Sequence, residues 1–451
     1  NNTDQPNRRS SQANGKTQRQ PLNMMKTDEK IGIGAYGTKS EGIGGIVRER
    51  INDFIVEEIS TQRVGERGEY LIVEVEKRNW DTHKLIRDLS RILRVSQNRF
   101  GWAGTKDKRA ITRQRISIWN VAPEDVERIT LRDVRLRVIG RSNRKISLGD
   151  HCANSFQVTI RGIEDSIDAT ITRIERITEE LRGRKGAPNF FGVQRFGEVR
   201  PITHLVGRSL IEENPREAVM TYLTKRYPSE DPEAIEARRY LAETEDFKAS
   251  IKLYPKNLTF ELAILHHLTT HPDDYLGALS KLPENLRRLF IHAYQSYLFN
   301  KILTKRMKSG IPLETAVPGD IVCFKKSTGL PDTDRLQRVN RENVDGINRL
   351  IERGRAFVTA PLPGYGTPLA TEMPGEIERE VLREEEIKLE DFKIKPAEYA
   401  SRGMRREVLT NPNPTCSVTE DELHNNHTKA TLNFTLQKGS YATTVLREYM
   451  K

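Results

Sequence analysis

The sequence predicts an α+β protein, in which a domain with a mixed or antiparallel sheet is interrupted by a mainly helical insertion. Three observations carry this prediction: strand and helix patterns are mixed irregularly over residues 31–204, helical spacing dominates residues 205–310, and strand patterns return near the C-terminus. Irregular mixing of this kind is typical of the α+β class. We therefore assign residues 31–204 and 405–451 to the interrupted domain and residues 205–404 to the insertion.

The first part of the chain contains strands and amphipathic helices in succession. Alternation of apolar and polar residues predicts strands at EYLIVEVEK, VRLRVIG and FQVTIRG. In THKLIRDLSRILRVS the apolar residues recur at helical spacing, with Asp81 or Thr82 as the N-cap. A second amphipathic helix is predicted over about residues 167–181, where isoleucine and leucine side chains share one side.

The insertion contains a long predicted helix. Pro283 opens it and Gly310 closes it, an asymmetry that suits a helix. Its apolar stripe is formed by Leu286, Leu289, Phe290, Ala293, Tyr297 and Leu298. Lys305, Arg306 and Lys308 lie outside this stripe, so we expect them on the surface. Strand patterns then return in ATLNFTLQKGSYATTVLREYM.

Composition narrows the classes of protein. The 451 residues include 74 Lys plus Arg against 63 Asp plus Glu, a net charge of +11. This balance favours a polyanionic partner such as nucleic acid, and a basic enzyme with a well-solvated surface is the alternative. No run approaches the roughly 18 apolar residues of a membrane span, and the chain shows no signal-sequence pattern. The three cysteines lack metal-ligand spacing, so we expect reduced thiols in a cytoplasmic protein.

Two stretches look like ligand sites but lack the required context. GIGAYG, at Gly32–Gly37, fits the GxGxxG pattern, yet no strand precedes it and no helix-forming stretch follows, so a flexible loop is favoured. Residues 1–30 are polar and rich in Asn, Gln and Arg, and we predict that they are disordered. HPDDY, from His271 to Tyr275, looks like a helix N-cap after a turn, so we expect no metal site there.

One carboxylate stands in a strongly basic turn. In GWAGTKDKRAITRQ, Asp107 lies between Lys106 and Lys108. Flanking cations keep a carboxylate ionised, which suits a nucleophile, whereas the alternative is a solvated surface turn. A second stretch, PNFFGVQRFG, combines aromatic side chains that can stack on nucleobases with an amide that can read a base edge. A buried hydrophobic turn is an equal alternative for this second stretch.

Seven stretches, taken in order, resemble the TruD family of pseudouridine synthases. They are GIGGIVRERINDFIVEE, KRNWDT, GWAGTKDKRAITRQ, ANSFQVTIRG, NFFGVQRFG, APLPGYGT and LQKGSYATTVLRE. The resemblance runs from about Gly32 to Tyr449. It implies a pseudouridine synthase domain with a helical insertion, tRNA as the partner, and uridine 13 of the D arm as the target. Lys305, Arg306 and Lys308 would then line an RNA cleft, with a solvated helix face as the alternative.

The resemblance also implies roles for individual residues. Asp107, in the GxKD motif, is the catalytic residue. Asn189 and Phe191, in the NxFGxQRFG stretch, hold and stack the target base. Phe54, in the NDF segment, lines the same pocket.

Two of the expected substrate-binding residues are basic. Arg48 stands where bacterial members carry a lysine, which keeps the charge but changes its geometry. Lys106, next to Asp107, is expected to lie close to the substrate phosphates. The stretch SRGMRR is similar to the SKGSRR of relatives and departs from it at Met404.

The implied reaction needs few parts. Breaking the N-glycosidic bond builds oxocarbenium-like charge on the ribose, and a carboxylate stabilises that charge, adds to the sugar or removes a sugar proton. The target base leaves its stack and then turns within an enclosed aromatic pocket. No redox, group-transfer or hydrolysis step occurs, so we expect no metal, no organic or nucleotide cofactor and no obligatory protein partner. The alternatives are a non-catalytic RNA-binding protein of the same fold and a nucleotide-dependent enzyme that uses the Gly32 loop.

Overall fold

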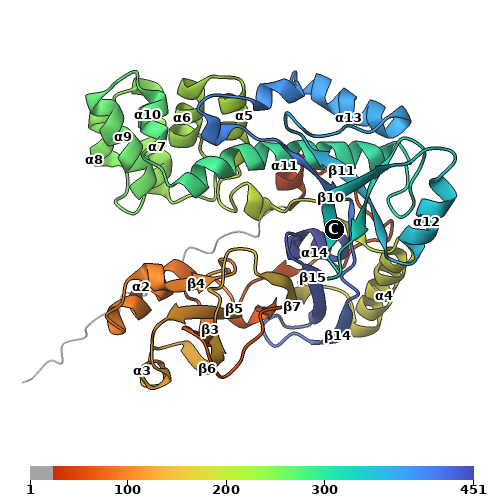
Figure 1. Ribbon diagram of the computed structural model, residues 1–451, viewed down its shortest axis with the longest axis horizontal. Helices are drawn as coiled ribbons and strands as arrows, with labels where there is room; N and C mark the ends of the chain where they lie inside the picture. The colour runs from red at the N-terminus through yellow and green to blue at the C-terminus, as the bar shows by residue number, and fades with distance from the viewer. Residues whose placement is uncertain (1–23) are drawn as a thin grey trace, which may run out of the picture.

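The computed structural model describes residues 24–451, so the disorder predicted for residues 1–23 falls outside the described residues. A sheet-based lower body and a mainly helical upper body lie against each other (Figure 1). The chain fills much of the lower body first, passes into the upper body in green and cyan, and returns to the lower body in dark blue. The chain thus leaves the lower body and returns to it near its C-terminal end.

Helices occur in both bodies. They are α1 (Met24–Lys30), α2 (Thr82–Ile92), α3 (Pro123–Glu127), α4 (Ile167–Gly183), α5 (Thr203–Ile211), α6 (Pro215–Thr224), α7 (Pro232–Thr244), α8 (Phe247–Leu253), α9 (Thr259–Thr270), α10 (Tyr275–Leu279), α11 (Glu284–Lys308), α12 (Val344–Glu352), α13 (Glu372–Glu384) and α14 (Ala442–Met450).

The strands form two larger sheets and one short pair. They are β1 (Ile46–Val47), β2 (Phe54–Ser60), β3 (Tyr70–Arg78), β4 (Phe100–Trp102), β5 (Ile111–Trp119), β6 (Val134–Ser142), β7 (His151–Ile163), β8 (Ala187–Pro188), β9 (Ile321–Lys325), β10 (Pro331–Arg338), β11 (Ala356–Leu362), β12 (Met404–Glu407), β13 (Leu409–Thr410), β14 (Thr415–Glu420) and β15 (Thr428–Gln437). The predicted α+β class is confirmed.

The large sheet is mixed, as predicted. Its order is β14–β15–β7–β2–β5–β3–β6, with β1 paired to β7 and β4 paired to β5. Neighbouring strands are antiparallel except β2 and β5, which run parallel with Ile55 opposite Ile111. Parallel neighbours begin at the same edge of a sheet. The segments that precede β2 and β5, which carry Arg48 and Asp107, therefore reach the same edge.

The first predicted strand and helix are both present. β3 buries Leu71, Val73 and Val75 on one face, and the apolar side of α2 packs in the same core cluster. The carboxylate of Asp81 accepts a hydrogen bond from the Lys84 amide at 2.8 Å. Asp81 is therefore the N-cap of α2, the first of the two predicted alternatives.

α11 is buried on more sides than its predicted stripe. It crosses the upper body and contacts α5, α13 and β11 (Figure 1). α5 approaches it closely at Gly207, where a Cβ atom would lie 2.0 Å from the carbonyl oxygen of Phe290. Elements therefore cover several faces of α11, and polar residues outside the stripe are buried too.

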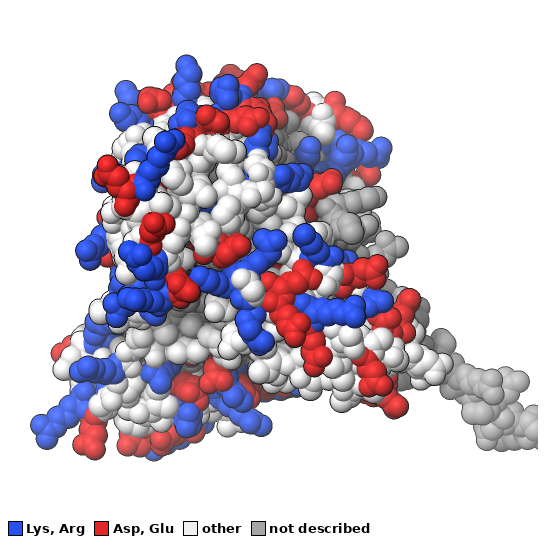
Figure 2. Space-filling view, turned by 90° about the vertical axis from the view of Figure 1, so that its right-hand side faces the viewer, with Lys and Arg blue, Asp and Glu red and all other residues white. Residues whose placement is uncertain are grey.

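Two of the three basic side chains at the end of α11 are engaged by carboxylates. Arg306 is buried, and its Nη1 and Nη2 atoms bind the two oxygens of Asp320 at 2.6 and 2.9 Å. The ammonium of Lys305 donates to Glu384, while Lys308 is exposed. The expectation of a surface position is thus wrong for Arg306, because a residue from the following loop pairs with it. Figure 2 shows basic and acidic side chains mixed over one whole face of the molecule.

The insertion contains a four-stranded antiparallel sheet that the sequence patterns do not predict. Its order is β10–β9–β11–β12. Ala356 of β11 pairs with Phe324 of β9, and Leu362 of β11 pairs with Met404 of β12. Short apolar runs such as β9 and β11 cannot be distinguished from buried helix by periodicity alone. β12 begins at Met404, so this sheet extends across the predicted boundary between residues 404 and 405.

α1 forms at the end of the segment that the sequence predicts to be disordered. Arg447 of α14 donates to the Asp28 carboxylate at 2.8 Å, a contact between positions far apart in the sequence. Glu448 accepts from the amides of Gly37 and Thr38 at 2.9 and 3.1 Å. The glycine-rich loop therefore donates two main-chain amides to a protein carboxylate. In a nucleotide-binding motif, amides of such a loop donate to a phosphate.

The HPDDY stretch is a helix cap, as expected. Asp274 accepts from the Gly277 amide at 2.9 Å at the start of α10. Within residues 24–451, no three His, Cys, Asp or Glu side chains are grouped so that they could hold a metal ion. No helix in that part of the chain combines the length and the apolar character needed to cross a membrane.

Candidate active site

Arg48 joins Asp107 to two other parts of the molecule. Its Nη2 atom donates to Oδ2 of Asp107 at 2.9 Å, and its Nη1 atom donates to Oε1 of Glu198 at 3.0 Å. The guanidinium also covers the ring of Phe54, with 4.1 Å from Cζ to the ring centroid. The side chain of Asp107 is 39% exposed and that of Arg48 is 19% exposed. A largely covered cation thus holds one oxygen of an accessible carboxylate.

A buried lysine fixes the main chain at Asp107. Lys77, on β3, is fully buried, and its ammonium donates to the carbonyl oxygens of Trp80 at 2.7 Å and Asp107 at 3.0 Å. A third, longer hydrogen bond reaches the carbonyl of Lys106 at 3.4 Å. Burial lowers the pKa of Lys77 to about 8, and the negative charge of Asp107 partly opposes this shift. These bonds keep the loop before β5 in one position.

The ammonium of Lys106 points into the sheet. It lies 2.8 Å from Oε2 of Glu58 and donates to Oδ1 of Asn154 at 2.9 Å. The side chains of Lys106 and Glu58 are 7% and 1% exposed. Although Lys106 is adjacent to Asp107 in sequence, its positive charge is neutralised by Glu58 of the sheet. The structure does not bring it to the guanidinium of Arg48.

Asn189 is fully buried, and its side-chain amide is saturated with hydrogen bonds. Its Nδ2 atom donates to the main-chain carbonyl and to Oε1 of Glu407, both at 3.1 Å. Its Oδ1 atom accepts from Arg406 at 2.6 Å and from Ser440 at 3.1 Å. A primary amide has two donors and two lone pairs, and all four are used here. Asn189 thus ties the chain before η3 (Val193–Arg195) to β12 and to the turn before α14.

Phe191 lies in the core of the upper body. Its ring is 2% exposed and meets the ring of Phe299 edge-on at 5.5 Å between centroids. Its amide and carbonyl both bond to the side chain of Asn300, at 2.8 and 3.0 Å. The guanidinium of Arg406 lies 4.2 Å from the ring centroid, which makes a close cation–π contact. Arginine and aromatic side chains therefore cover the ring that the sequence assigns to base stacking.

Arg195 lies beside Phe191, three residues before Glu198 in the chain. Its guanidinium is 5.1 Å from the ring centroid of Phe191. Its Nε atom is buried and has no hydrogen-bond partner among residues 24–451. No carboxylate in the described chain forms an ion pair with it. An unpartnered guanidinium beside an aromatic ring can bind a phosphate or a carbonyl oxygen of a substrate.

A tight turn carries the chain from this cluster back to Asp107. Gly197 has a φ of 107°, and a Cβ atom there would lie 2.3 Å from the carbonyl oxygen of Arg200. Only glycine tolerates both conditions. The turn places Glu198 against Arg48, so the segment that contains Asn189 and Phe191 is linked to Asp107 through a single guanidinium.

The structure thus brings Arg48, Phe54 and Asp107 into one cluster, and Asn189 and Phe191 into a second cluster that is joined to the first through the chain at Glu198. The sequence motifs alone do not single out Lys77, Arg195, Glu198, Arg406 and Ser440. All five lie in or directly beside the quoted stretches KRNWDT, NFFGVQRFG, SRGMRR and LQKGSYATT. Adjacency to those stretches was the signal available for them.

Comparisons with known proteins converge on one family. The family model described as tRNA pseudouridine synthase D (TruD) matches residues 30–449. A protein named "Probable tRNA pseudouridine synthase D" from Methanosarcina mazei is 50% identical over 431 residues, which cover 95% of this chain and 98% of the relative. A relative of the same name from Archaeoglobus fulgidus is 38% identical over 424 residues, or 94% and 99% of the two chains. The crystal structure of a TruD protein from Methanosarcina mazei superposes with a TM-score of 0.83 at 49% identity, covering 95% and 98%.

Proposed function

The chain belongs to the TruD family of tRNA pseudouridine synthases, a family of isomerases, and on that premise we propose that it converts uridine 13 in the D arm of tRNA to pseudouridine, with Asp107 as the catalytic residue. The observation that carries the assignment of Asp107 is its ion pair with Arg48. The pair holds the carboxylate in a fixed direction while leaving it accessible, and both properties are needed for chemistry on a bound ribose.

The two oxygens of Asp107 have different surroundings, which supports a direct role in the reaction. Arg48 binds Oδ2, whereas Oδ1 accepts no hydrogen bond from any described residue. As the N-glycosidic bond breaks, positive charge develops on the ribose, and the free Oδ1 atom can stabilise it. Addition to the sugar and removal of a sugar proton both use that same oxygen. Arg48 keeps Oδ2 in place through either course.

The second cluster, which contains Asn189 and Phe191, is expected to bind the target base. We expect the target uridine to leave its stack and to meet Phe191, with Asn189 holding the walls of the pocket through its four hydrogen bonds. Arg195 and Arg406 cover the Phe191 ring. The base can be accommodated in two ways: Arg195 moves aside and the base meets the ring, or Arg195 itself stacks on the base. The free guanidinium of Arg195 is available for either arrangement. The reaction is expected in the cytoplasm, without a metal, a nucleotide or a protein partner.

The test is base-resolved mapping of pseudouridine in transcript tRNA after incubation with the pure protein. We expect one new pseudouridine, at position 13, and none in a tRNA whose uridine 13 is replaced by cytidine. Pseudouridine at another position instead would contradict the assignment to uridine 13. Binding of tRNA with no pseudouridine at any position would leave an RNA-binding protein that keeps the fold without the chemistry.

A further inference from the structure

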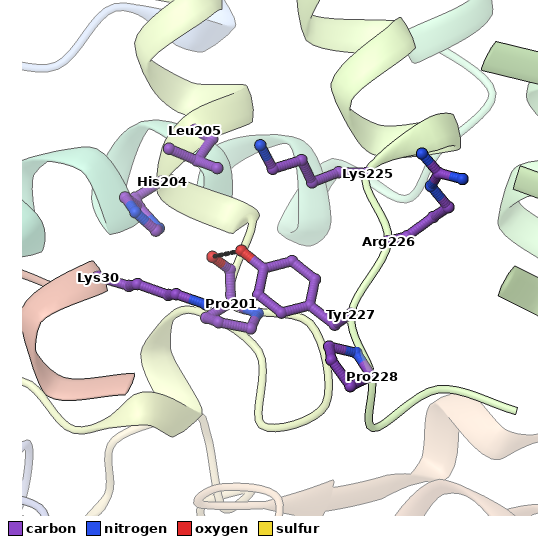
Figure 3. Close-up of a pocket in the computed structure, with 8 residues that line it drawn as sticks. All are labelled: Lys30, Pro201, His204, Leu205, Lys225, Arg226, Tyr227 and Pro228. Atoms are coloured by element: carbon purple, nitrogen blue, oxygen red, sulfur yellow. Dashed lines mark hydrogen bonds between the residues drawn. The ribbon is translucent and has the colours of Figure 1, made fainter. Parts of the chain in front are cut away.

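A basic pocket opens on the upper body beside the segment that follows Glu198. It has a volume of about 320 Å³, and its lining includes Lys30, Pro201, Lys225 and Tyr227. In Figure 3 the side chain of Lys30 extends from α1 toward Pro201 and Tyr227, and that of Lys225 extends from the loop after α6 across the pocket toward Leu205 and His204. A pocket of this size is within the range of small-ligand sites.

The loop that carries Lys225 and Tyr227 is held rigidly by buried ion pairs. Arg238 is 1% exposed, and it donates to the Leu223 carbonyl at 2.6 Å and to Glu261 at 2.8 Å. Arg200 donates to the carbonyl of Lys225 at 2.9 Å. The main chain of this loop is therefore fixed from inside the protein. A ligand that binds its outward-facing side chains does not have to order the loop first.

The cations at the pocket have no acidic partners. None of Lys30, Lys225 and Arg226 forms an ion pair with a carboxylate of residues 24–451, in contrast to Lys305 and Arg306 on α11. The ammonium of Lys30 instead lies 5.2 Å from the ring centroid of Tyr227. Unpaired, exposed ammonium groups that converge on one cavity favour an anionic ligand. Unpaired positive charge, which we expected from Lys305 and Arg306 on α11, is thus present at this pocket.

The floor of the pocket adds an unsatisfied polar group. His204 lines the pocket, is 3% exposed and stacks on Tyr297. Its Nδ1 atom is buried without a hydrogen-bond partner in the described part of the chain. Burial lowers the pKa of His204 to about 4, so the ring is neutral at physiological pH.

The pocket lies close to the candidate active site along the chain. Pro201, in its wall, is three residues after Glu198, so their Cα atoms are at most about 11 Å apart. The hydroxyl of Tyr227 donates to the carbonyl of Pro201, and that of Ser229 donates to the carbonyl of Val199. The pocket loop and the segment that bonds Arg48 therefore form one connected unit.

We propose that the pocket of Lys30, Lys225 and Tyr227 binds a backbone phosphate of the RNA strand that carries the target uridine, a few nucleotides from the reacting base. This inference rests on the proposed function, because it takes Asp107 as the place of the target uridine. The two ammonium groups supply charge for the phosphate, and the Tyr227 ring supplies a face for the attached sugar or base. RNA recognition by phosphate and shape needs such fixed charges more than base-edge contacts.

The experiment compares two double variants of the full chain. Lys30→Ala with Lys225→Ala removes the two pocket ammonium groups. Arg349→Ala with Arg353→Ala removes two exposed charges from α12 and its C-terminal end, and so matches the change in net charge; α12 lies at the right-hand edge of Figure 1, whereas α6 lies toward the left. Both variants are first shown to melt at the temperature of the parent. Binding of transcript tRNA is then measured over a series of salt concentrations, together with kcat and KM for pseudouridine formation.

The pocket variant is expected to lose about one unit of salt slope, because it no longer neutralises one phosphate, while the α12 variant keeps the slope of the parent. Its KM should rise about tenfold or more, since each lost contact to a charged group corresponds to roughly tenfold in affinity. Its kcat should stay within about twofold of the parent, because the pocket does not touch the reacting atoms.

Equal slopes in the two variants would overturn the proposal, whether both slopes match the parent or both fall. The slope is read without turnover. A parent protein that binds tRNA but leaves position 13 unmodified therefore contradicts the proposed function, while the comparison of slopes still decides the pocket.

Discussion

The guanidinium of Arg48 lies 2.9 Å from the Asp107 carboxylate, and the two residues reach each other because β2 and β5 run parallel. Each residue stands on the segment that precedes one of these strands, at the shared edge of the sheet. The same guanidinium bonds Glu198, at the end of the segment that holds Asn189 and Phe191. Asp107 is therefore positioned by a side chain that also connects the two clusters of the candidate site.

Arg48→Lys should lower kcat more than it changes KM. A lysine keeps the positive charge but cannot bond Asp107 and Glu198 with two separate donors in a planar fork. A small displacement of a catalytic group costs about 10- to 100-fold in rate, and we expect a loss of this size. Glu198→Gln, which leaves the pair with Asp107 intact, is the matched control and should lose less. Steady-state kinetics on transcript tRNA measures both, and a kcat for Arg48→Lys equal to that of the parent would contradict this role.

The reaction should slow as pH rises through about 8, because of Lys77. Its ammonium has three hydrogens for three carbonyl oxygens, and the neutral amine has only two. Since burial holds the pKa of Lys77 at about 8, well below its usual value of 10.5, the folded protein releases this proton first. The contribution of Lys77 to the free energy of unfolding then increases with pH between about 8 and 10.5.

Deprotonation of Lys77 above about pH 8 is thus expected to lower activity without lowering stability. Single-turnover rates and unfolding curves across this pH range test it, with Lys77→Met as the comparison. The variant should be slower at every pH and should lack the step near pH 8. A parent rate that stays constant across the step, or a variant with the same step, would rule Lys77 out as its cause.

Arg306→Met should destabilise the protein instead of altering RNA binding. The substitution leaves Asp320 fully buried without its cation, and breaking a buried ion pair in this way costs about 3–5 kcal/mol. Lys308→Met, on an exposed position two residues away, should change the free energy of unfolding by less than about 0.5 kcal/mol. Denaturant unfolding of both variants makes the comparison. Equal stabilities would mean that the pair with Asp320 contributes nothing.

Phe191→Ala should reduce both turnover and stability. The ring is buried against Phe299 and Arg406, so its removal should cost about 3–5 kcal/mol of unfolding free energy. Loss of stacking on the target base, worth about 1–3 kcal/mol, should lower turnover further, while phosphate contacts preserve most of the affinity for tRNA. Rates are therefore measured well below the melting temperature of the variant. A folded variant with the turnover of the parent would remove Phe191 from base handling.

Local patterns predict the elements of this chain better than they predict its polar contacts. Alternation is enough to place β3, and helical spacing together with Asp81 is enough to place α2. The same alternation puts Lys77 on the face of Leu71, Val73 and Val75, a charged residue at a buried position, which marks it as unusual.

Polar contacts between distant segments have no local signature. Asn189 is saturated by Arg406 and Ser440, more than 200 positions later in the chain. A helical projection of α11 cannot show that Asp320 will cover Arg306. For this reason the sequence indicates which residues are candidates for the site but not which of them are free to meet a substrate.

The catalytic role of Asp107 is tested most directly by Asp107→Asn. The substitution keeps the shape of the side chain and removes the charge that the ribose intermediate needs. Its affinity for tRNA should stay within a few-fold of the parent, because phosphate contacts elsewhere supply most of the binding energy. Base-resolved mapping of transcript tRNA after prolonged incubation should show pseudouridine with the parent protein and none with the variant. Pseudouridine formed at position 13 by a sequence-verified Asp107→Asn protein would contradict the assignment of Asp107 as the catalytic residue.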